Sequence, residues 1–165
     1  MADRVPPTLE VRLAAVLHPW RGVASEREVR DRVARLKFTN RTAATVAAYL
    51  THWPQPEWLD ASDAQLRRWL AAASPPLVPA LLDLFEAQGN DKTLRGRVEA
   101  LLAARPALDV SALALSGSQI MSALGVGPSP EVGKAARYLL DAVLDKPELN
   151  SEQELTRLLA SWKPT

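Results

Sequence analysis

The chain has 165 residues, of which 47% are hydrophobic and 24% are charged, and it contains no cysteine. This composition is that of an ordinary globular protein, and the absence of cysteine excludes a disulfide framework, a zinc–thiolate site and a cysteine nucleophile. Alanine and leucine dominate, whereas β-branched and aromatic residues are few, which favours helix over strand. We therefore expect an all-α protein, built as a multi-helix array of short helices in two helical subdomains.

The formal net charge is only +1, but the charges are unevenly distributed. Residues 1–41 contain nine basic and five acidic groups and residues 92–137 six and three, whereas residues 42–91 contain two and six and residues 138–165 three and five. Folding could bring the two basic blocks onto one face, which would suit RNA. The same charges also fit solvated helix faces with local ion pairs.

Two helices are predicted near the N-terminus. The first lies within residues 8–18, and its apolar face is expected to consist of Leu9, Leu13, Val16 and Leu17. The second begins with a capping box formed by Ser25 and Glu28. Its apolar stripe is expected to be Val29, Val33 and Leu36. The first apolar run is too short to span a bilayer and lacks a cleavage pattern, so we expect a cytoplasmic protein with no membrane association.

A third helix is predicted over residues 40–53, ending against Pro54 and Pro56. These prolines indicate a boundary between a domain of residues 1–53 and one of residues 54–165. Further helices are expected over residues 62–73, 75–88, 91–104, 117–124, 130–144 and 151–162. Two of them have capping boxes, formed by Ser62 with Gln65 and by Ser116 with Gln119.

Glycine and proline are concentrated just before the longest predicted helix. The turn and helix-cap motif consists of Gly125, Gly127, Pro128, Ser129, Pro130 and Gly133. Ser129 is expected to be the N-cap and Pro130 the first helical residue, so that free backbone amides face the loop. This arrangement is either a structural turn or a phosphate site, with Lys134 and Arg137 one turn further on. Gly133 would permit another helix or a ligand to approach closely.

The region around this turn follows a long ordered pattern of leucine, glycine and proline. The matching positions are Leu115, Gly117, Ile120, Met121, Leu124, Gly125, Pro128, Pro130, Val132, Gly133, Leu139, Leu140, Val143, Pro147, Asn150 and Leu155. In this pattern the chain resembles the C-terminal end of bacterial tRNA nucleotidyltransferases, the family of CCA-adding enzymes and poly(A) polymerases. Ser129 departs from the family, which usually has glycine there.

The resemblance extends to the N-terminal part of the chain. "RLAAVLHPW" resembles the HD-like region of the same family, and "RLKFTNRTAATVAAYLTHW" resembles the segment that follows it. Active HD hydrolases have an aspartate where this chain has Pro19. The two histidines, His18 and His52, cannot supply the several ligands that an HD metal site needs. We therefore interpret residues 1–53 as a degenerate HD-like neck and body region without a metal site, in which both histidines are packing or loop residues.

The resemblance implies a catalytic head that this chain lacks. The family adds nucleotides with an Asp-x-Asp carboxylate pair that holds magnesium, and no Asp-x-Asp or Glu-x-Asp pair occurs in these 165 residues. We therefore expect no catalytic residue, no cofactor in this chain, and magnesium only with the missing head. A metal-dependent HD phosphohydrolase is a third and much weaker alternative.

Two functions follow from these observations. In the first, the chain is the tRNA- or RNA-binding helical part of such an enzyme, or a stand-alone relative, and works with a separate nucleotidyltransferase head. Residues 54–165 would be the C-terminal body and tail, and the candidate phosphate contacts are Arg27, Arg30, Lys37, Arg41, Lys92, Arg95, Lys134 and Arg137. In the second, the chain is a non-catalytic protein-interaction or structural module. Its tryptophans, Trp53, Trp58, Trp69 and Trp162, would then be interface anchors, although core packing is the alternative role.

Overall fold

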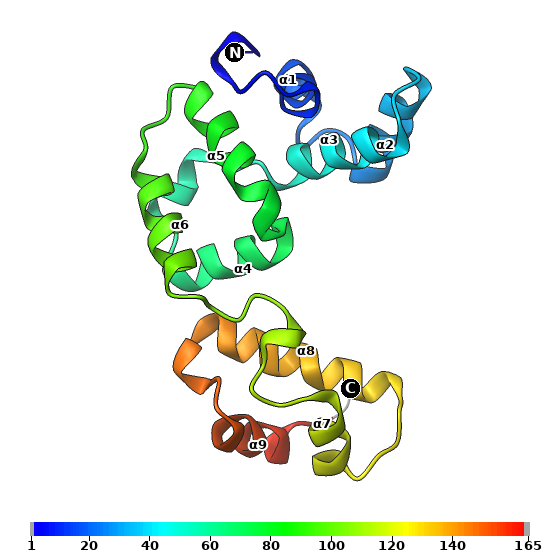
Figure 1. Cartoon of the computed structure of the whole chain (residues 1–165), viewed down its shortest axis with the longest axis vertical. Coiled ribbons are helices and arrows are strands. Elements are labelled where there is room, and N and C mark those ends of the chain that lie inside the picture. Colours follow the sequence, from blue (N-terminus) through cyan, green and yellow to red (C-terminus); the bar gives the residue numbers. More distant parts are fainter. Residues whose placement is uncertain (1, 164–165) are drawn as a thin grey trace. The chain divides into compact units, whose positions relative to one another are not determined.

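The computed structural model describes residues 2–163, and within this range the chain forms nine α-helices and no strand (Figure 1). The predicted all-α array of short helices is thereby confirmed. The helices are α1 (Leu9–Val16), α2 (Glu26–Arg35), α3 (Asn40–His52), α4 (Asp63–Ala73), α5 (Val78–Ala87), α6 (Thr93–Ala103), α7 (Gly117–Leu124), α8 (Pro130–Asp145) and α9 (Glu152–Ser161). Short 3-10 helices lie at Ala2–Arg4, His18–Trp20, Pro56–Asp60, Pro75–Leu77, Val110–Ala112 and Pro147–Leu149.

The described chain divides into two compact units. Unit 1 contains the residues up to Ala61 together with Ala72–Glu99, and unit 2 contains Ser62–Ala71 together with the residues from Ala100 onward. The chain thus changes unit inside α4 and again inside α6. This division by packing differs from the boundary between residues 1–53 and 54–165 that Pro54 and Pro56 indicate, and those two ranges stay a prediction.

Unit 1 is organised around α3. Helices α1 and α2 both pack against α3, and α5 contacts α1 and α3 (Figure 1). Its buried apolar side chains include Val11, Val29, Val33, Val46, Leu50, Leu81, Leu84 and Phe85. Because α2 buries only Val29 and Val33, all its charged side chains lie on the solvent side.

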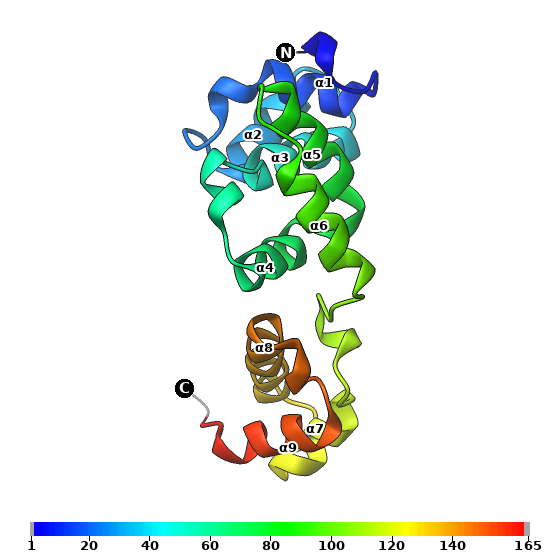
Figure 2. The same cartoon turned by 90° about the vertical axis from the view of Figure 1, so that its left-hand side faces the viewer.

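Unit 2 has its own apolar core, formed chiefly by α7, α8 and α9 (Figure 2). The buried members of this core are Ala107, Leu113, Leu115, Ile120, Ala135, Leu139, Val143, Leu155 and Leu159. The spacing of Ala135, Leu139 and Val143 places them on one face of α8, as a helical period requires. Most of these residues belong to the pattern on which the family resemblance depends, so their burial explains the apolar part of that pattern.

The predicted helix starts are confirmed by their hydrogen bonds. The Glu28 amide donates to Ser25 Oγ over 3.3 Å, and the Ser25 amide donates back to the Glu28 carboxylate over 2.8 Å. Ser62 with Gln65 and Ser116 with Gln119 form the same two reciprocal bonds. Each box satisfies amides that have no helical partner, which is why these helices begin where the local sequence indicates.

The predicted buried face of α1 is wrong. Leu9 and Val16 are 50% and 64% exposed, and the helix instead buries Val11, Ala14 and Ala15. Both faces of this short helix are apolar, so periodicity alone did not distinguish them, and the face with the smaller side chains is the one that is buried. The stripe predicted for α2 is also wrong at its last member, because Leu36 lies beyond the end of the helix and is 59% exposed.

The tryptophans lie largely in the interior. Trp53 and Trp69 are buried, and the Trp53 indole donates to Gln88 Oε1 over 3.0 Å. Trp58 and Trp162 are half-buried. The structure therefore favours packing over interface anchoring as the role of these four side chains.

Among residues 2–163 no single helix is long and apolar enough to cross a bilayer, although the bent pair Asp63–Ala73 and Pro75–Ala87 passes by length and composition when taken together.

Candidate nucleic-acid interface

The connection between α2 and α3 in unit 1 brings the strongest basic segment of the chain to the surface. Helix α2 ends at Arg35, and Lys37 turns the chain in a left-handed conformation with φ of 64°. Thr39 then caps α3 by accepting a hydrogen bond from the Thr42 amide over 3.1 Å. The two helices are consequently adjacent, with a tight turn between them.

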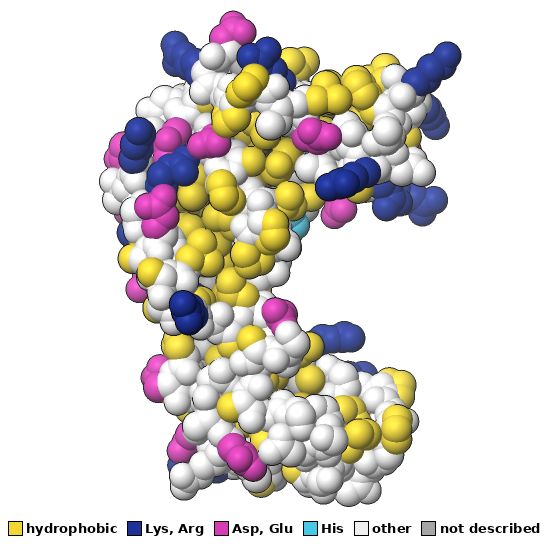
Figure 3. Space-filling view, viewed as in Figure 1, with side chains coloured by type: hydrophobic (Ala, Val, Ile, Leu, Met, Phe, Trp, Pro, Cys, Tyr) yellow, Lys and Arg dark blue, Asp and Glu magenta, His cyan; other side chains and the backbone are white. Residues whose placement is uncertain are grey.

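This connection forms what we name the α2–α3 basic surface, which consists of Arg27, Arg30, Arg32, Arg35, Lys37 and Arg41. All six side chains are exposed, and Figure 3 shows Lys and Arg groups gathered at this end of unit 1 with few acidic groups between them. The sequence predicted four of these residues as contacts and missed Arg32 and Arg35. The narrow apolar face of α2 is the signal that would have identified them.

Most of this surface is available to a ligand. Arg27 lies 3.9 Å from the Asp31 carboxylate, in a pair whose side chains are 84% and 55% exposed. The Arg32 guanidinium lies 5.2 Å from the centre of the Trp20 ring. The side chains of the other four members form no hydrogen bond or ion pair with any residue in the described range: Arg30, Arg35, Lys37 and Arg41. An exposed pair such as Arg27 with Asp31 contributes at most about 1 kcal/mol, so Arg27 also remains able to meet a phosphate.

Two members of this surface share a hollow between α2 and α3. Arg30 comes from α2 and Arg41 from the first turn of α3, and the space that they border has a volume of about 580 Å³. The hollow is lined by Arg30, Asp31, Ala34, Asn40, Arg41 and Ala44. The fold thus brings together two predicted contacts that are eleven residues apart in the sequence.

The remaining predicted contacts of unit 1 lie elsewhere on that unit. Lys92 is exposed directly before α6. Arg95 is partly buried and donates to Glu86 over 2.5 Å and to Asp83 over 2.7 Å. The bond to Glu86 is the main reason that the pKa of Arg95 is raised. Because two carboxylates of α5 neutralise its charge, Arg95 links α5 to α6 within unit 1 and is a weak candidate for a phosphate contact.

The predicted contacts of unit 2 lie on α8. Lys134 and Arg137 are both exposed on this helix. Gly125 ends α7 in the left-handed region at φ of 66°, and the Val126 amide donates to the Met121 carbonyl over 3.1 Å to close the turn. Gly127 and the motif's prolines complete the predicted connection to α8, with Pro128 in the loop and Pro130 as the first helical residue.

Two details of this turn differ from expectation. Ser129 is the N-cap of α8, as predicted, but its side chain makes no capping bond, and its buried hydroxyl has no hydrogen-bond partner among the described residues. A Cβ added to Gly133 would meet no atom within 4 Å among residues 2–163, apart from its chain neighbours and its own helix backbone. No other helix of the described chain therefore approaches Gly133 closely, and the approach of a ligand there stays a prediction.

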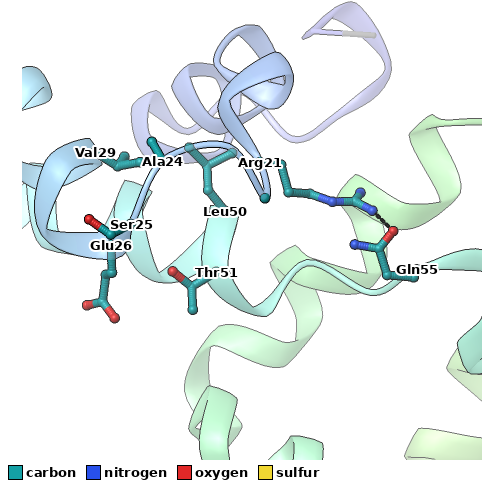
Figure 4. Close-up of a pocket in the computed structure, with 9 residues that line it drawn as sticks. Arg21, Ala24, Ser25, Glu26, Val29, Leu50, Thr51 and Gln55 are labelled. Carbon is teal, nitrogen blue, oxygen red and sulfur yellow. Dashed lines mark hydrogen bonds between the residues drawn. The ribbon is translucent and has the colours of Figure 1, made fainter.

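A second hollow of unit 1, of about 280 Å³, lies between the α2 start and the end of α3 (Figure 4). On one side of it the Arg21 guanidinium donates to the Gln55 side chain, and it also lies 5.9 Å from the centre of the Trp53 ring. Burial lowers the pKa of Arg21, and Glu57 partly opposes this effect. Arg21 is thus already engaged within unit 1, which makes it a weaker candidate for RNA than the α2–α3 basic surface.

His18 belongs to the same polar network. Its ring lies edge-on to Trp53 at 4.9 Å between ring centres, and Nε2 lies 3.3 Å from Arg21 Nη1 and 2.8 Å from Gln88 Nε2. Both neighbours are donors, since the Gln88 oxygen accepts from Trp53, so Nε2 must be the unprotonated acceptor. Burial, followed by the charge of Arg21, lowers the pKa of His18. The structure thus gives His18 a packing role.

A pair of arginines on α4 was missed by the sequence analysis. Arg67 is buried, and it donates from Nε to the Leu144 carbonyl over 2.7 Å and from Nη2 to the Asp145 carbonyl over 2.9 Å. Arg68 is more exposed and contacts Asp145 over 2.6 Å and Asp141 over 3.1 Å. Hydrogen bonding to Arg68 lowers the pKa of Asp145. Both arginines hold α4 to the end of α8 inside unit 2, and no local sequence signal indicates partners so far along the chain.

No group of three or more His, Asp or Glu side chains in residues 2–163 is placed to hold a metal ion. Comparison with known proteins adds no assignment: no family model matches the chain, and no curated protein or solved structure matches it at a significant level. The α2–α3 basic surface and the exposed cations of α8 are therefore the features from which a function has to be argued.

Proposed function

We propose that this chain is an RNA-binding helical module that holds structured RNA, tRNA in particular, by its phosphate backbone. The observation that supports this proposal is the α2–α3 basic surface. Residues 26–41 contain six basic and three acidic side chains, and four of the basic groups have no partner in the described range. Cations of this kind supply most of the affinity of non-specific nucleic-acid binding and orient the protein on the backbone.

In line with the family resemblance, we further propose that the bound tRNA is positioned for 3′-end nucleotide addition by a catalytic head outside this chain. The chain by itself should not add nucleotides, because it contains no Asp-x-Asp pair to hold magnesium. Magnesium would belong to the head, and the role of this chain would be to bind and orient the RNA.

The test is the binding of labelled total tRNA, followed by fluorescence anisotropy across a salt series. Each phosphate contact on a duplex contributes about 0.9 to the slope of log affinity against log salt. The double variant Arg35→Gln with Lys37→Gln should make this slope shallower by about 1.8, since both side chains lie on the basic surface outside the hollow. Glutamine removes the positive charge but keeps an unbranched polar side chain, so it should tolerate the left-handed conformation at position 37 about as well as lysine does.

A matched control removes the same charge elsewhere. Arg157→Gln with Lys163→Gln alters two exposed cations of unit 2 and should leave the slope close to that of the wild-type chain. Lys134→Ala with Arg137→Ala tests the predicted contacts of α8 in the same assay. Absence of tRNA binding at low salt would reject the proposal, and equal slope changes in the first variant and the control would reject the α2–α3 basic surface as its location.

The alternative is a protein-interaction or structural module. The observation that favours it is the set of large apolar side chains exposed on unit 1, namely Leu9, Val16, Val23 and Leu36. Exposed apolar groups of this kind are a feature of docking surfaces when they lie together. A chain that fails to bind tRNA but forms a stable complex with a nucleotidyltransferase head would support this alternative.

A further inference from the structure

The hollow between α2 and α3 contains a side chain that phosphate binding does not explain. Arg30 and Arg41 line it from two helices, and Asp31 lines it as well. A carboxylate beside a phosphate is unfavourable unless it accepts a hydrogen bond from another part of the same ligand. The occupant suited to this hollow therefore has an anionic group and, next to it, a neutral donor.

The cations of the hollow are able to hold the anionic group. Neither the Arg30 nor the Arg41 side chain has a hydrogen bond or ion pair with another residue of the described range, and both side chains are exposed. Guanidinium groups match the geometry of phosphate oxygens and bind them through paired N–H donors. Two such groups from different helices border one space, so a single phosphate could contact both.

Asp31 supplies the acceptor. Within residues 2–163 its side chain pairs only with Arg27, at 3.9 Å, which is longer than a hydrogen bond, and it is 55% exposed. An ionised carboxylate has about four acceptor positions, so most of them remain available. The amide of Asn40 adds a further donor and acceptor at the rim.

The space itself fits a small polar unit. Its volume of about 580 Å³ falls within the range of roughly 300–1,000 Å³ that small-molecule sites occupy. Ala34 and Ala44 contribute only small side chains to its lining. The exposed rim would let a polymer enter and leave on either side.

We propose that this hollow binds one ribonucleotide of a single-stranded RNA segment, with Arg30 and Arg41 on the phosphate and Asp31 accepting a hydrogen bond from the ribose 2′-hydroxyl. The inference rests on the proposed RNA-binding function and adds a selectivity to it. The 2′-hydroxyl is the group by which a protein distinguishes RNA from DNA at a single position. The module should therefore prefer RNA to DNA of the same sequence.

The experiment compares two labelled single strands, one RNA and one DNA, made only of adenine and cytosine so that they differ solely in the 2′-hydroxyl. Anisotropy titrations at fixed salt give the ratio of the two dissociation constants. A hydrogen bond to a charged group corresponds to about a tenfold effect, so the wild-type chain should bind the RNA about tenfold more tightly. Asp31→Ala should reduce this ratio to about one.

The ratio separates recognition from simple electrostatics. Loss of the Asp31 charge alters the attraction of both strands alike, whereas loss of its acceptor affects only RNA. Glu26→Ala is the matched control, because it removes a carboxylate from the same helix outside this hollow and should keep the tenfold ratio. Arg30→Ala with Arg41→Ala should weaken RNA binding, reduce the salt slope by about 1.4 and abolish the preference.

The outcomes distinguish this inference from the function on which it rests. Equal binding of RNA and DNA by the wild-type chain, or a ratio in Asp31→Ala equal to that of the wild type, overturns the ribonucleotide site while tRNA binding stands. Binding of tRNA without binding of the single-stranded RNA also overturns the ribonucleotide site and leaves the proposed tRNA binding intact. If neither RNA binds, the proposed function fails and this inference fails with it.

Discussion

Substitution of Arg67 tests how unit 2 is held together. The last carbonyls of a helix have no partners within it, and Arg67 supplies donors to two of these groups at the end of α8, on Leu144 and Asp145. Its positive charge also meets the negative end of the α8 dipole. The side chain is only 8% exposed, so water cannot readily replace these bonds.

The expected effect of Arg67→Met follows from these contacts. Two hydrogen bonds from a charged donor stabilise the folded chain by about 1.5–3 kcal/mol each. Methionine loses both bonds, but it also avoids the cost of burying a charge, which offsets part of that loss. We therefore expect the free energy of unfolding to fall by about 3 kcal/mol. Arg67→Lys should give a smaller loss, since lysine keeps the charge but cannot present two donors in a fixed fork.

Urea unfolding followed by circular dichroism measures the loss, and hydrogen exchange locates it. The Lys146 amide, which donates to the Ala142 carbonyl over 3.0 Å at the end of α8, should exchange faster in Arg67→Met. Arg68→Met is the control, because this neighbouring arginine makes only exposed ion pairs and should contribute less. A loss in Arg67→Met no larger than that in Arg68→Met would refute the role assigned to the buried bonds.

Two further predictions concern single side chains. Burial and Arg21 lower the pKa of His18, so the unfolded chain binds this proton more readily than the folded chain. The free energy of unfolding should therefore fall as the pH drops from about 6.5 toward the folded-state pKa, and His18 should contribute no pH dependence above about 6.5. His18→Gln should lack this part of the dependence in urea titrations at about pH 7.5 and about pH 5.5, and an unchanged profile would contradict the assignment. Gly125→Ala should lower the free energy of unfolding by about 1 kcal/mol, because φ at this position is 66°, even though a Cβ would meet no neighbour. Gly133→Ala should instead raise the free energy of unfolding by up to about 1 kcal/mol, because Gly133 lies inside α8. Thermal unfolding checks this pair, and effects of the same sign would contradict the reasoning.

The charge distribution explains why a chain of net charge +1 can be proposed to bind RNA. Residues 26–41, which include α2 and the start of α3, have six basic and three acidic side chains, while carboxylates elsewhere neutralise Arg68 and Arg95. Electrostatic attraction at physiological salt acts over about 8 Å, so the local excess matters more than the total. This local excess lies entirely within unit 1.

The sequence by itself determined the fold class and the ends of most helices. Capping bonds join residues three positions apart, so the boxes at Ser25, Ser62 and Ser116 could be read without knowledge of the packing. The predicted starts and ends agree with the structure to within about one helical turn. The exposure of Arg27 and Arg30, the two predicted cations of α2, follows from the same local periodicity.

Only the tertiary structure decided which of these local features meet. The buried face of α1 depends on the shape of α3, which periodicity within α1 does not contain. Arg67 finds its acceptors 77 residues away, and Arg95 is neutralised by carboxylates of the preceding helix. The hollow shared by Arg30 and Arg41 likewise exists because α2 packs against α3. Such contacts join residues on different helices. They cannot be predicted from local sequence, because burial and pairing depend on the neighbours that each side chain acquires on folding.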